Sequence, residues 1–328
     1  MKRFILTTTF LFQLVTALTS TNAQTNKSDK FPESPELKKV AQAGYTFLKI
    51  GVDARSSGLG EATLTLENDA ATLFLNPAGI TSIEKNSVFV GYTTWIADIQ
   101  KTAAAFARNL GQWGHIAVSA AYMDYNSIEG TEIDPFDPMG YRDIGNIGLQ
   151  EYVIGLTYGR RFTDRFGLGI TTKYCRQDLQ AKSSNVIAFD VGTIYDLRWH
   201  GIKIGMSILH FARNMKYIEE TYRLPLTFNI GATIDVLSAA SLENDLHQWC
   251  FFIAANNPID YSERVHLGTE YWYRNMIALR CGYKFNYDEE GVTFGGGIRY
   301  DGFDMSYSYA DFGPFLGSVS RLSVSFNF

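Results

Sequence analysis

The chain ends with Arg321-Leu-Ser-Val-Ser-Phe-Asn-Phe328, and this stretch decides the fold. Apolar side chains stand at every second position, at Leu322, Val324, Phe326 and Phe328. The positions between them are polar, namely Arg321, Ser323, Ser325 and Asn327. Because successive side chains of a β-strand point to opposite faces, the pattern predicts a strand with one apolar and one polar face. A last strand that ends in Phe is typical of outer-membrane proteins, so Phe326 and Phe328 are the predicted C-terminal assembly signal.

The same period of two recurs along most of the chain. The ranges 165–174, 226–236, 277–285 and 303–309 carry bulky apolar residues on one face and mainly Gly, Ser, Thr or charged residues on the other. A soluble β-sandwich also alternates. A membrane barrel is favoured because small residues crowd the polar faces and because Tyr recurs at strand ends, as at Tyr122, Tyr158, Tyr174, Tyr195, Tyr273 and Tyr300.

Counting these runs gives fourteen strands, an even number, as single-chain bacterial barrels have. The predicted strands are 86–95, 100–109, 113–123, 151–162, 165–176, 185–197, 201–211, 222–236, 246–256, 262–273, 275–285, 291–300, 302–311 and 318–328. We therefore predict an all-β fold, a 14-stranded antiparallel transmembrane β-barrel over residues 84–328. The longest connection, 124–150, is rich in Asp and Pro and is predicted to be an external loop.

Residues 1–23 have the organisation of a signal peptide. Two basic residues precede a short apolar stretch, and the small residues Thr21 and Ala23 mark a cleavage site. The polar range 24–42 is then expected to be a flexible leader of the mature chain. Later segments lack a run of about 18 apolar residues, so a chain that spans a membrane must cross it with strands. The expected location is the cell outer membrane.

Residues 43–83 interrupt the alternating pattern and are predicted to form a small N-terminal plug, helical in part and otherwise irregular. The range 68–75 resembles a short capped helix that ends near Pro77. A fourteen-stranded lumen is wider than wall side chains alone can fill, so another segment must occupy it unless the barrel conducts. We predict that this segment folds into the periplasmic mouth.

Motifs for catalysis or cofactor binding are weak. The net charge of −5 at pH 7 does not indicate nucleic acid binding. Nucleophile-elbow, zinc-protease and phosphate-loop patterns do not occur, and Gly58-Leu-Gly60 lacks the third glycine of a dinucleotide motif. We therefore predict a non-enzymatic protein without a cofactor, a metal site or a nucleic-acid partner. Three cysteines are interpreted as apolar fillers, with one disulfide as the alternative: Cys175, Cys250 and Cys281.

Charged residues also fall on the polar faces of the predicted strands. Because both signs are present, they are expected to pair with one another and with the N-terminal segment rather than to form a selectivity lining. These residues are Lys173, Asp190, Lys203, Asp235, Glu270, Arg280, Lys284, Arg299 and Asp304. Within 124–150, Glu132, Asp134 and Asp137 lack the spacing of a calcium loop and are interpreted as a solvated acidic loop.

The segment before the first predicted strand carries four short motifs in order. They are Phe47-Leu-Lys-Ile-Gly-Val-Asp-Ala-Arg55, Gly58-Leu-Gly-Glu-Ala62, Asn68-Asp-Ala-Ala71 and Asn76-Pro-Ala-Gly79. In these motifs the chain resembles the PorV/PorQ family of outer-membrane proteins, which is similar to the FadL group of fourteen-stranded, plugged barrels. The residues that carry the resemblance are Phe47, Leu48, Ala54, Arg55, Gly58, Gly60, Asp69, Ala70, Asn76, Pro77, Ala78 and Gly79.

The resemblance implies a role in type IX protein secretion, in which PorV-type proteins bind the C-terminal sorting domains of secreted cargo. It implies these domains, other secretion-system components and outer-membrane lipid as partners. The candidate partner-binding loop is 124–150, where Phe136, Met139 and Tyr141 lie among acidic residues. The alternative is a FadL-like transporter of hydrophobic small molecules, for which the predicted lumen is rather polar.

Overall fold

The computed structural model describes residues 43–328 apart from short gaps at 127, 180–181, 214, 218–219 and 243–244. The signal peptide predicted at 1–23 and the leader predicted at 24–42 lie outside the described residues.

Fourteen antiparallel strands form a closed barrel, which confirms the predicted fold class. The strands are β1 (Asn86–Thr94), β2 (Gln100–Asn109), β3 (His115–Asp124), β6 (Leu149–Thr163), β7 (Phe166–Leu179), β8 (Lys182–Asp196), β9 (Lys203–Ala212), β12 (Thr227–Asp235), β13 (His247–Pro258), β14 (Arg264–Tyr273), β15 (Ile277–Phe285), β16 (Val292–Tyr300), β17 (Phe303–Asp311) and β18 (Ser318–Asn327). Each corresponds to one predicted run, and the largest difference is at β12, which begins at Thr227 rather than at 222.

Pairing between β1 and β18 closes the barrel. Val88 lies opposite Phe326 and Tyr92 lies opposite Leu322 in the antiparallel register. At the end of this ladder the Asn86 N–H donates to the Phe328 carbonyl at 3.0 Å, and the Phe328 N–H donates to the Asn86 carbonyl at 3.1 Å. Closure pairs both edges of the sheet, so this sheet presents no open template for another chain.

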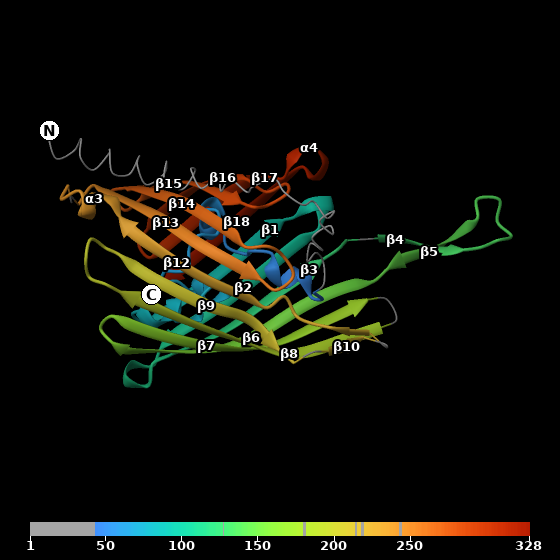
Figure 1. The fold of residues 1–328 in the computed structure, drawn as a ribbon, viewed down its shortest axis with the longest axis horizontal. Helices are drawn as coiled ribbons and strands as arrows, with labels where there is room; N and C mark the ends of the chain where they lie inside the picture. Colours follow the sequence, from blue (N-terminus) through green and yellow to red (C-terminus); the bar gives the residue numbers. More distant parts are fainter. Residues whose placement is uncertain (1–42, 127, 180–181, 214, 218–219, 243–244) are drawn as a thin grey trace, which may run out of the picture. The chain divides into compact units, whose positions relative to one another are not determined.

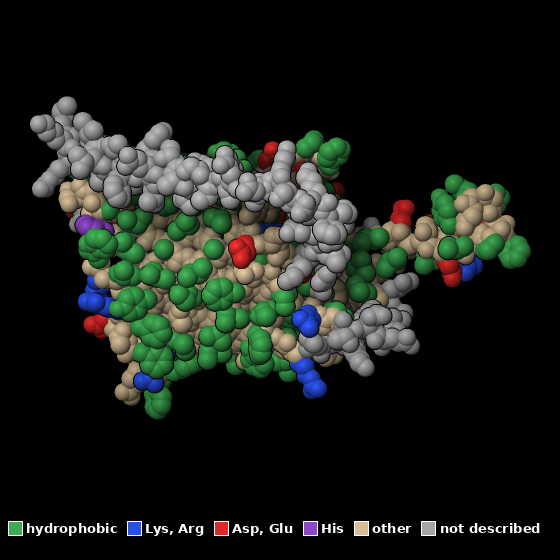
Figure 2. Space-filling model, in the orientation of Figure 1, with side chains coloured by type: hydrophobic (Ala, Val, Ile, Leu, Met, Phe, Trp, Pro, Cys, Tyr) green, Lys and Arg blue, Asp and Glu red, His purple; other side chains and the backbone are tan. Residues whose placement is uncertain are grey.

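Side chains alternate across the wall, because strand geometry sends successive residues to opposite faces. In β3 the small side chains of Ala117 and Ala121 are buried. The neighbouring Ile116 and Val118 point to the other face and are exposed. Figure 2 shows the exposed apolar side chains as a broad green area over the strands. Such an area is unfavourable in water and matches the outward face of a membrane barrel.

Two short hairpins extend from one end of the barrel. β4 (Ile128–Ile133) pairs with β5 (Tyr141–Ile147), and β10 (Met215–Tyr217) pairs with β11 (Glu220–Tyr222). In Figure 1 the β4–β5 hairpin projects beyond the barrel strands. We name this end of the barrel the hairpin end, and we name the opposite end, where β1 begins and β18 ends, the turn end. The loop predicted over 124–150 therefore contains a hairpin, which was missed because most residues on both of its faces are exposed.

Helices in the described part of the chain are short. They are η1 (Thr46–Lys49), α2 (Ala54–Gly58), η2 (Ala70–Phe74), η3 (Pro77–Ser82), η4 (Ile96–Asp98), η5 (Gly111–Trp113), α3 (Val236–Ala239) and α4 (Gly313–Leu316). Over those same residues, no helix has the length and apolar character needed to cross a membrane.

Residues 43–83, named the inner segment, run through the lumen from the hairpin end to the turn end. At the hairpin end Ala43 forms a β-bridge with Arg223, just after β11. At the turn end the Asn109 side-chain amide donates to the carbonyl of Ile83 at 3.1 Å. The segment therefore extends further than the single mouth expected from the sequence, and which of the two mouths is periplasmic stays a prediction. Its later part lies at the turn end, but its first part reaches the opposite mouth.

An apolar core lies between the inner segment and the wall formed by β1, β2 and β3. The inward positions of β2 and β3 are mostly alanine, which leaves room for the larger side chains of the inner segment. The core includes Phe47, Val52, Leu73, Ile80, Ile83, Phe89, Ala103, Ala105, Ala107, Ala117 and Ala121. Burial of these side chains stabilises the segment inside the barrel.

Candidate functional site

Three polar residues of the inner segment begin its short helical turns. Asp53 accepts the backbone N–H groups of Arg55 (3.1 Å) and Ser56 (2.9 Å) at the start of α2. Asp69 accepts the N–H of Ala71 at 2.9 Å, and the Asn76 Oδ1 accepts the N–H of Ala78 at 3.1 Å. Side-chain acceptors at this position satisfy backbone donors that a helix start leaves free. The predicted capped helix at 68–75 is thus present as the 3-10 helix η2.

The motif residues are mostly buried against the wall. Asn76 connects two parts of the molecule, because its Nδ2 donates to the Leu64 carbonyl at 2.7 Å and to the Thr193 carbonyl of β8 at 3.1 Å. Leu48, Arg55 and Asp69 are only partly exposed. The other motif residues are buried, namely Phe47, Ala54, Gly58, Gly60, Ala70, Asn76, Pro77, Ala78 and Gly79. The family motifs therefore lie at the contacts between the inner segment and the barrel.

Two motif glycines permit close backbone approach. A Cβ at Gly58 would lie 3.0 Å from the Gly295 Cα of β16, closer than such atoms normally come. Gly60 has a φ of 63°, a conformation that favours glycine, and it lies against the backbone of Leu267 and Tyr283. Gly58 and Gly60 thus allow α2 to pack directly on the wall. This close packing accounts for the two glycines, which do not form a phosphate-binding motif.

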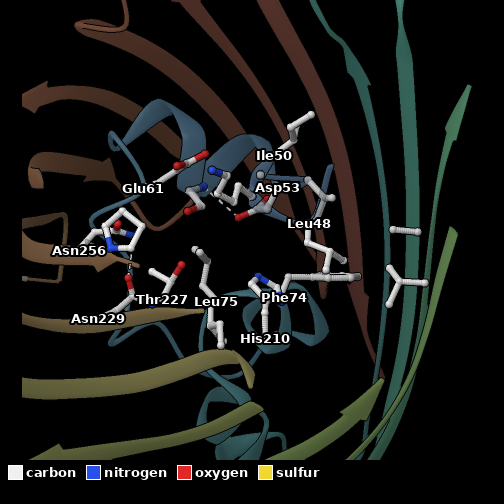
Figure 3. Close-up of a pocket in the computed structure, with 18 of the residues that line it drawn as sticks. Leu48, Ile50, Asp53, Glu61, Phe74, Leu75, His210, Thr227, Asn229 and Asn256 are labelled. Carbon is white, nitrogen blue, oxygen red and sulfur yellow. Dashed lines mark hydrogen bonds between the residues drawn. The ribbon is translucent and has the colours of Figure 1, made fainter. Parts of the chain in front are cut away.

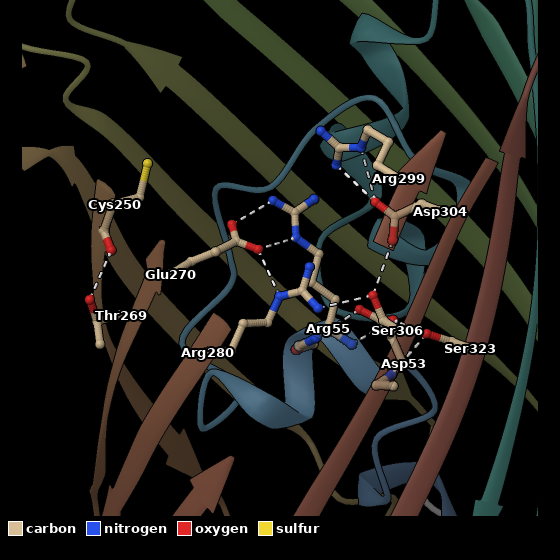
Figure 4. A network of polar contacts seen from close by, with 12 residues as sticks. Asp53, Arg55, Cys250, Thr269, Glu270, Arg280, Arg299, Asp304, Ser306 and Ser323 are labelled. Atoms are coloured by element: carbon tan, nitrogen blue, oxygen red, sulfur yellow. Dashed lines mark hydrogen bonds and ion pairs between the residues drawn. The ribbon is translucent and has the colours of Figure 1, made fainter. Parts of the chain in front are cut away.

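Arg55 anchors α2 to the wall through a buried charge network (Figure 4). Its Nε and Nη2 donate to the two oxygens of Glu270, at 2.9 and 2.7 Å. Arg280 donates to the same carboxylate at 2.8 Å through Nε and to Ser306 Oγ at 3.0 Å through Nη1. The Glu270 carboxylate raises the pKa of Arg55 above its ordinary value although burial acts in the opposite direction. A bidentate, charge-assisted pair of this kind is both strong and specific in geometry.

Trp272 lies at the centre of this network with an exposed fraction of 2%. Three guanidinium groups lie over its ring, those of Arg299, Arg280 and Arg55 at 4.2, 5.3 and 5.8 Å from the ring centre. Arg299 is in turn held by Asp304, with N–O distances of 2.9 and 3.1 Å. The sequence placed Glu270 and Arg280 in the lumen, but the contribution of Trp272 was not predicted.

All but one of the predicted lumen charges form ion pairs, as expected from their mixed signs. Lys284 contacts Glu61 of the inner segment at 3.0 Å and Glu290 at 2.6 Å. Burial would raise the pKa of Glu61, but Lys284 and Arg321 lower it to about 2. Of the remaining predicted lumen residues, Lys173 pairs with Asp190, Lys203 pairs with Glu67, and Asp235 caps α3 through the N–H groups of Leu237 and Ser238.

Among the cavities lined by described residues, two lie beside the inner segment. The one towards the hairpin end has a volume of about 110 Å³. Figure 3 shows its mixed lining, with Leu48, Ile50 and Phe74 near the polar Asp53 and His210. The second, of about 710 Å³, lies towards the turn end beside the Arg55 network. Within the described ranges, no group of three or more His, Cys, Asp or Glu side chains is arranged to hold a metal ion. The cysteines Cys175, Cys250 and Cys281 are free thiols.

The β4–β5 hairpin displays the candidate partner-binding residues. Phe136 and Met139 at its tip are 96% and 72% exposed, and Tyr141 at the start of β5 is 45% exposed. The backbone N–H groups of Phe136 and Met139 donate to Asp134 and Asp137, at 3.0 and 2.8 Å. These acidic residues therefore shape the turn that presents the apolar side chains.

The C-terminal aromatic residues lie on the outer face of the closing strand. Phe326 is 40% exposed and Phe328 is 53% exposed. Their rings stack with centres 5.2 Å apart. Their role as an assembly signal stays a prediction.

The fold and the filled lumen define an outer-membrane β-barrel. The family described as type IX secretion system protein PorV matches residues 33–238, more than half of the chain. The chain therefore belongs to the PorV family.

Two of the solved structures with a similar fold are named for the passage of aromatic hydrocarbons. The toluene transporter TodX of Pseudomonas putida has 13% identity and a TM-score of 0.58, over 89% of this chain and 100% of that one. The CymD monoaromatic hydrocarbon channel has 11% identity and a TM-score of 0.54, over 85% of this chain and 98% of that one. At these identities the likeness concerns the fold. No curated protein sequence matches the chain.

Proposed function

We propose that the protein is a partner-binding component of type IX protein secretion, and that the β4–β5 hairpin contacts the partner. The observation that carries the proposal is the exposed apolar tip of Phe136 and Met139 on a hairpin that extends beyond the membrane-facing strands. Exposed aromatic and Met side chains with a polar rim are typical of protein contacts. Membership of the PorV family supports the secretion pathway as the setting.

The orientation of the barrel supports this proposal. Outer-membrane barrels carry their longer loops outside and their short turns in the periplasm. The hairpin end then faces outside and the turn end faces the periplasm. With this orientation the hairpin faces the outside of the cell, and we expect C-terminal sorting domains of secreted proteins as its partners.

The filled lumen favours a binding role over an open pore. The inner segment is fixed by buried ion pairs such as Arg55–Glu270 and Glu61–Lys284, which a solute path along the axis would have to break. Removing one member of a buried pair costs about 3–5 kcal/mol.

A test in the native host separates hairpin binding from barrel stability. In a strain with Phe136→Ala and Tyr141→Ala, proteins with a shared C-terminal sorting domain should accumulate in the periplasm. The matched control is Phe315→Ala in α4, which is 91% exposed at the same end of the barrel. Normal secretion in the double variant at wild-type protein levels would exclude the hairpin as the contact.

The second candidate function is transport of hydrophobic small molecules. It is favoured by the apolar part of the 110 Å³ cavity, where Leu48, Ile50 and Phe74 lie together. Deleting the gene should then leave secretion unchanged and slow growth on a hydrophobic carbon source.

A further inference from the structure

The turn end of the barrel has an uneven distribution of charge. We divide the rim at this end into two arcs. The first arc is formed by the turn ends of strands β1 to β9, and the second arc by those of β12 to β18. Among the residues that the structure describes, the exposed cations of the first arc are Lys85, Arg108, Arg160, Arg161, Arg165 and Arg198, beside the exposed carboxylates Glu84 and Asp164. Arg161 on the same arc is engaged by Glu67 of the inner segment. The second arc has Arg274 with Asp245 and Asp301.

Two of these arginines stand on the lipid-facing side of the wall. In β2 the exposed positions are even-numbered, and Arg108 continues the series of Ala104 and Phe106. In β6 Arg160 follows Leu156 and Tyr158 on the exposed face. Both lie near the ends of their strands at the turn end, where the apolar band stops. Long basic side chains at such positions place their charged groups in the headgroup layer.

Aromatic residues accompany the cations on the same arc. Trp113 is 72% exposed in the β2–β3 turn, and its carbonyl accepts a hydrogen bond of 2.9 Å from the Tyr158 hydroxyl. The Arg160 guanidinium lies 5.9 Å from the centre of the Phe162 ring. Trp and Tyr favour the membrane–water interface, so Trp113 and Tyr158 are expected to hold this part of the rim at the depth of the lipid headgroups.

The turns of this arc are also joined to one another. The Asp196 N–H donates to the Arg165 carbonyl at 2.8 Å, which places the β8–β9 turn beside the β6–β7 turn. Arg198 lies 3.5 Å from the Asp164 carboxylate, which is itself 87% exposed. Arg165 and Arg198 therefore lie close together on the rim, and Figure 2 shows Lys and Arg side chains at this end of the molecule.

We propose that the rim below β1 to β9, with the lipid-facing Arg108 of β2 and Arg160 of β6, is a binding surface for anionic phospholipid headgroups of the periplasmic leaflet; the choice of leaflet rests on the orientation given with the proposed function. The phosphate group of the lipid supplies the negative charge, and the acyl chains lie along the exposed apolar faces of β2, β3 and β6. Cationic side chains beside a membrane-spanning segment attract anionic lipid in this way. The second arc has too little positive charge to do the same, so the bound lipid is confined to one side of the barrel.

The experiment compares a double variant with a single control in purified protein. Arg108→Gln with Arg160→Gln removes the two lipid-facing cations, and Arg274→Gln removes the cation of the opposite arc. Each protein is reconstituted in nanodiscs of phosphatidylcholine with or without phosphatidylglycerol. Lipid that stays bound after extraction into detergent is identified by native mass spectrometry.

We expect the wild type and Arg274→Gln to retain phosphatidylglycerol in preference to phosphatidylcholine. The double variant should lose this preference by a factor on the order of ten. Equal retention in the wild type and in the double variant would overturn the proposal. Release of the lipid by inorganic phosphate at a matched concentration would assign the surface to free phosphate instead. If the preference is unchanged but the double variant no longer retains a periplasmic protein from the host, the arc is a protein contact and the lipid proposal is rejected.

Discussion

The inner segment is held by two opposite walls of the lumen in different ways. Towards β14 to β18, the contacts are charged and polar, as in the Arg55–Glu270 pair and the hydrogen bond between Asp69 and Ser325. Towards β6 to β9, the wall offers glycines, and a Cβ at Gly169 or Gly192 would overlap Pro77 or Asn76. The two sides differ in what they add to the other contacts. Towards β14 to β18, named the charged wall, a buried ion-pair network is added to the close backbone contacts of Gly58 and Gly60. Towards β6 to β9, named the glycine wall, Gly169 and Gly192 leave room for Pro77 and Asn76. A polar lumen can be filled either by satisfying its charges or by letting backbones approach each other.

Removing the inner segment should abolish both kinds of contact and have the largest effect. We expect deletion of 43–83 to convert a protein of low conductance into an open pore, because a fourteen-stranded lumen is too wide for wall side chains to fill. Single-channel recording in planar bilayers measures the change. Deletion of the β4–β5 hairpin, 128–147, is the control and should leave the low conductance unchanged. A large, stable conductance in the intact protein would show that the segment does not close the lumen.

Glu270→Gln should break the charged wall while leaving the glycine wall intact. The change leaves the buried Arg55 and Arg280 without their shared carboxylate, which costs about 3–5 kcal/mol. The temperature at which the folded barrel unfolds in a gel-shift assay should fall accordingly. Glu132→Gln is the matched control, because its pair with Arg142 is exposed and contributes about 0–1 kcal/mol. Similar unfolding temperatures in the two variants would contradict the assigned importance of the network.

Gly169→Ala should disturb the glycine wall while leaving the charges in place. The added methyl group meets the backbone of Pro77, so η3 must move, at a cost of about 1–3 kcal/mol. Gly148→Ala is the control, since a Cβ there meets no atom within 4 Å. Denaturant unfolding in detergent measures both. If Gly169→Ala is as stable as the control, the close approach of Pro77 to Gly169 does not contribute to the free energy of unfolding.

Asp69 should make the stability of the barrel depend on pH, with a smaller effect than the substitutions above. Burial, together with the nearby Asp53 carboxylate, raises the pKa of Asp69 from 3.8 to about 6. An acid whose pKa is raised in the folded state stabilises the fold when protonated, below its unfolded pKa, and this contribution is lost as pH rises through 6. Because the side chain is only partly buried, we expect a loss of about 1 kcal/mol between pH 4 and 7. Asp69→Asn should remove this slope, and an unchanged slope would assign it to another group.

The barrel strands could be predicted because one face of each strand meets lipid and the other meets the lumen. The final strand shows this clearly, with Leu322 exposed and Arg321 and Ser323 buried, as the alternation predicted. The β4–β5 hairpin lacks that difference between faces, since Ile133 and Phe136 are both exposed. Without a buried face, the period of two carries no signal.

The inner segment could be predicted to fill the lumen, but its path and partners could not. Arg55 and Glu270 are 215 positions apart, and no local pattern connects them. The charges of β14 and β15 could be placed in the lumen from alternation, whereas the choice of partner depends on how far the segment reaches along the axis. The guanidinium groups around Trp272 likewise come from three separate elements, α2, β15 and β16.

The direction of the inner segment has a consequence for assembly. The segment is covalently continuous with β1 at one mouth and begins, at Ala43, beside Arg223 at the other. A chain placed in this way cannot swing out on a single hinge, because its first residues would have to travel the whole length of the axis. Nor can it enter easily after closure, since a free end would have to be threaded through a finished ring. Enclosing the segment while the sheet is still open avoids this threading, so the seam between β1 and β18 is expected to form last.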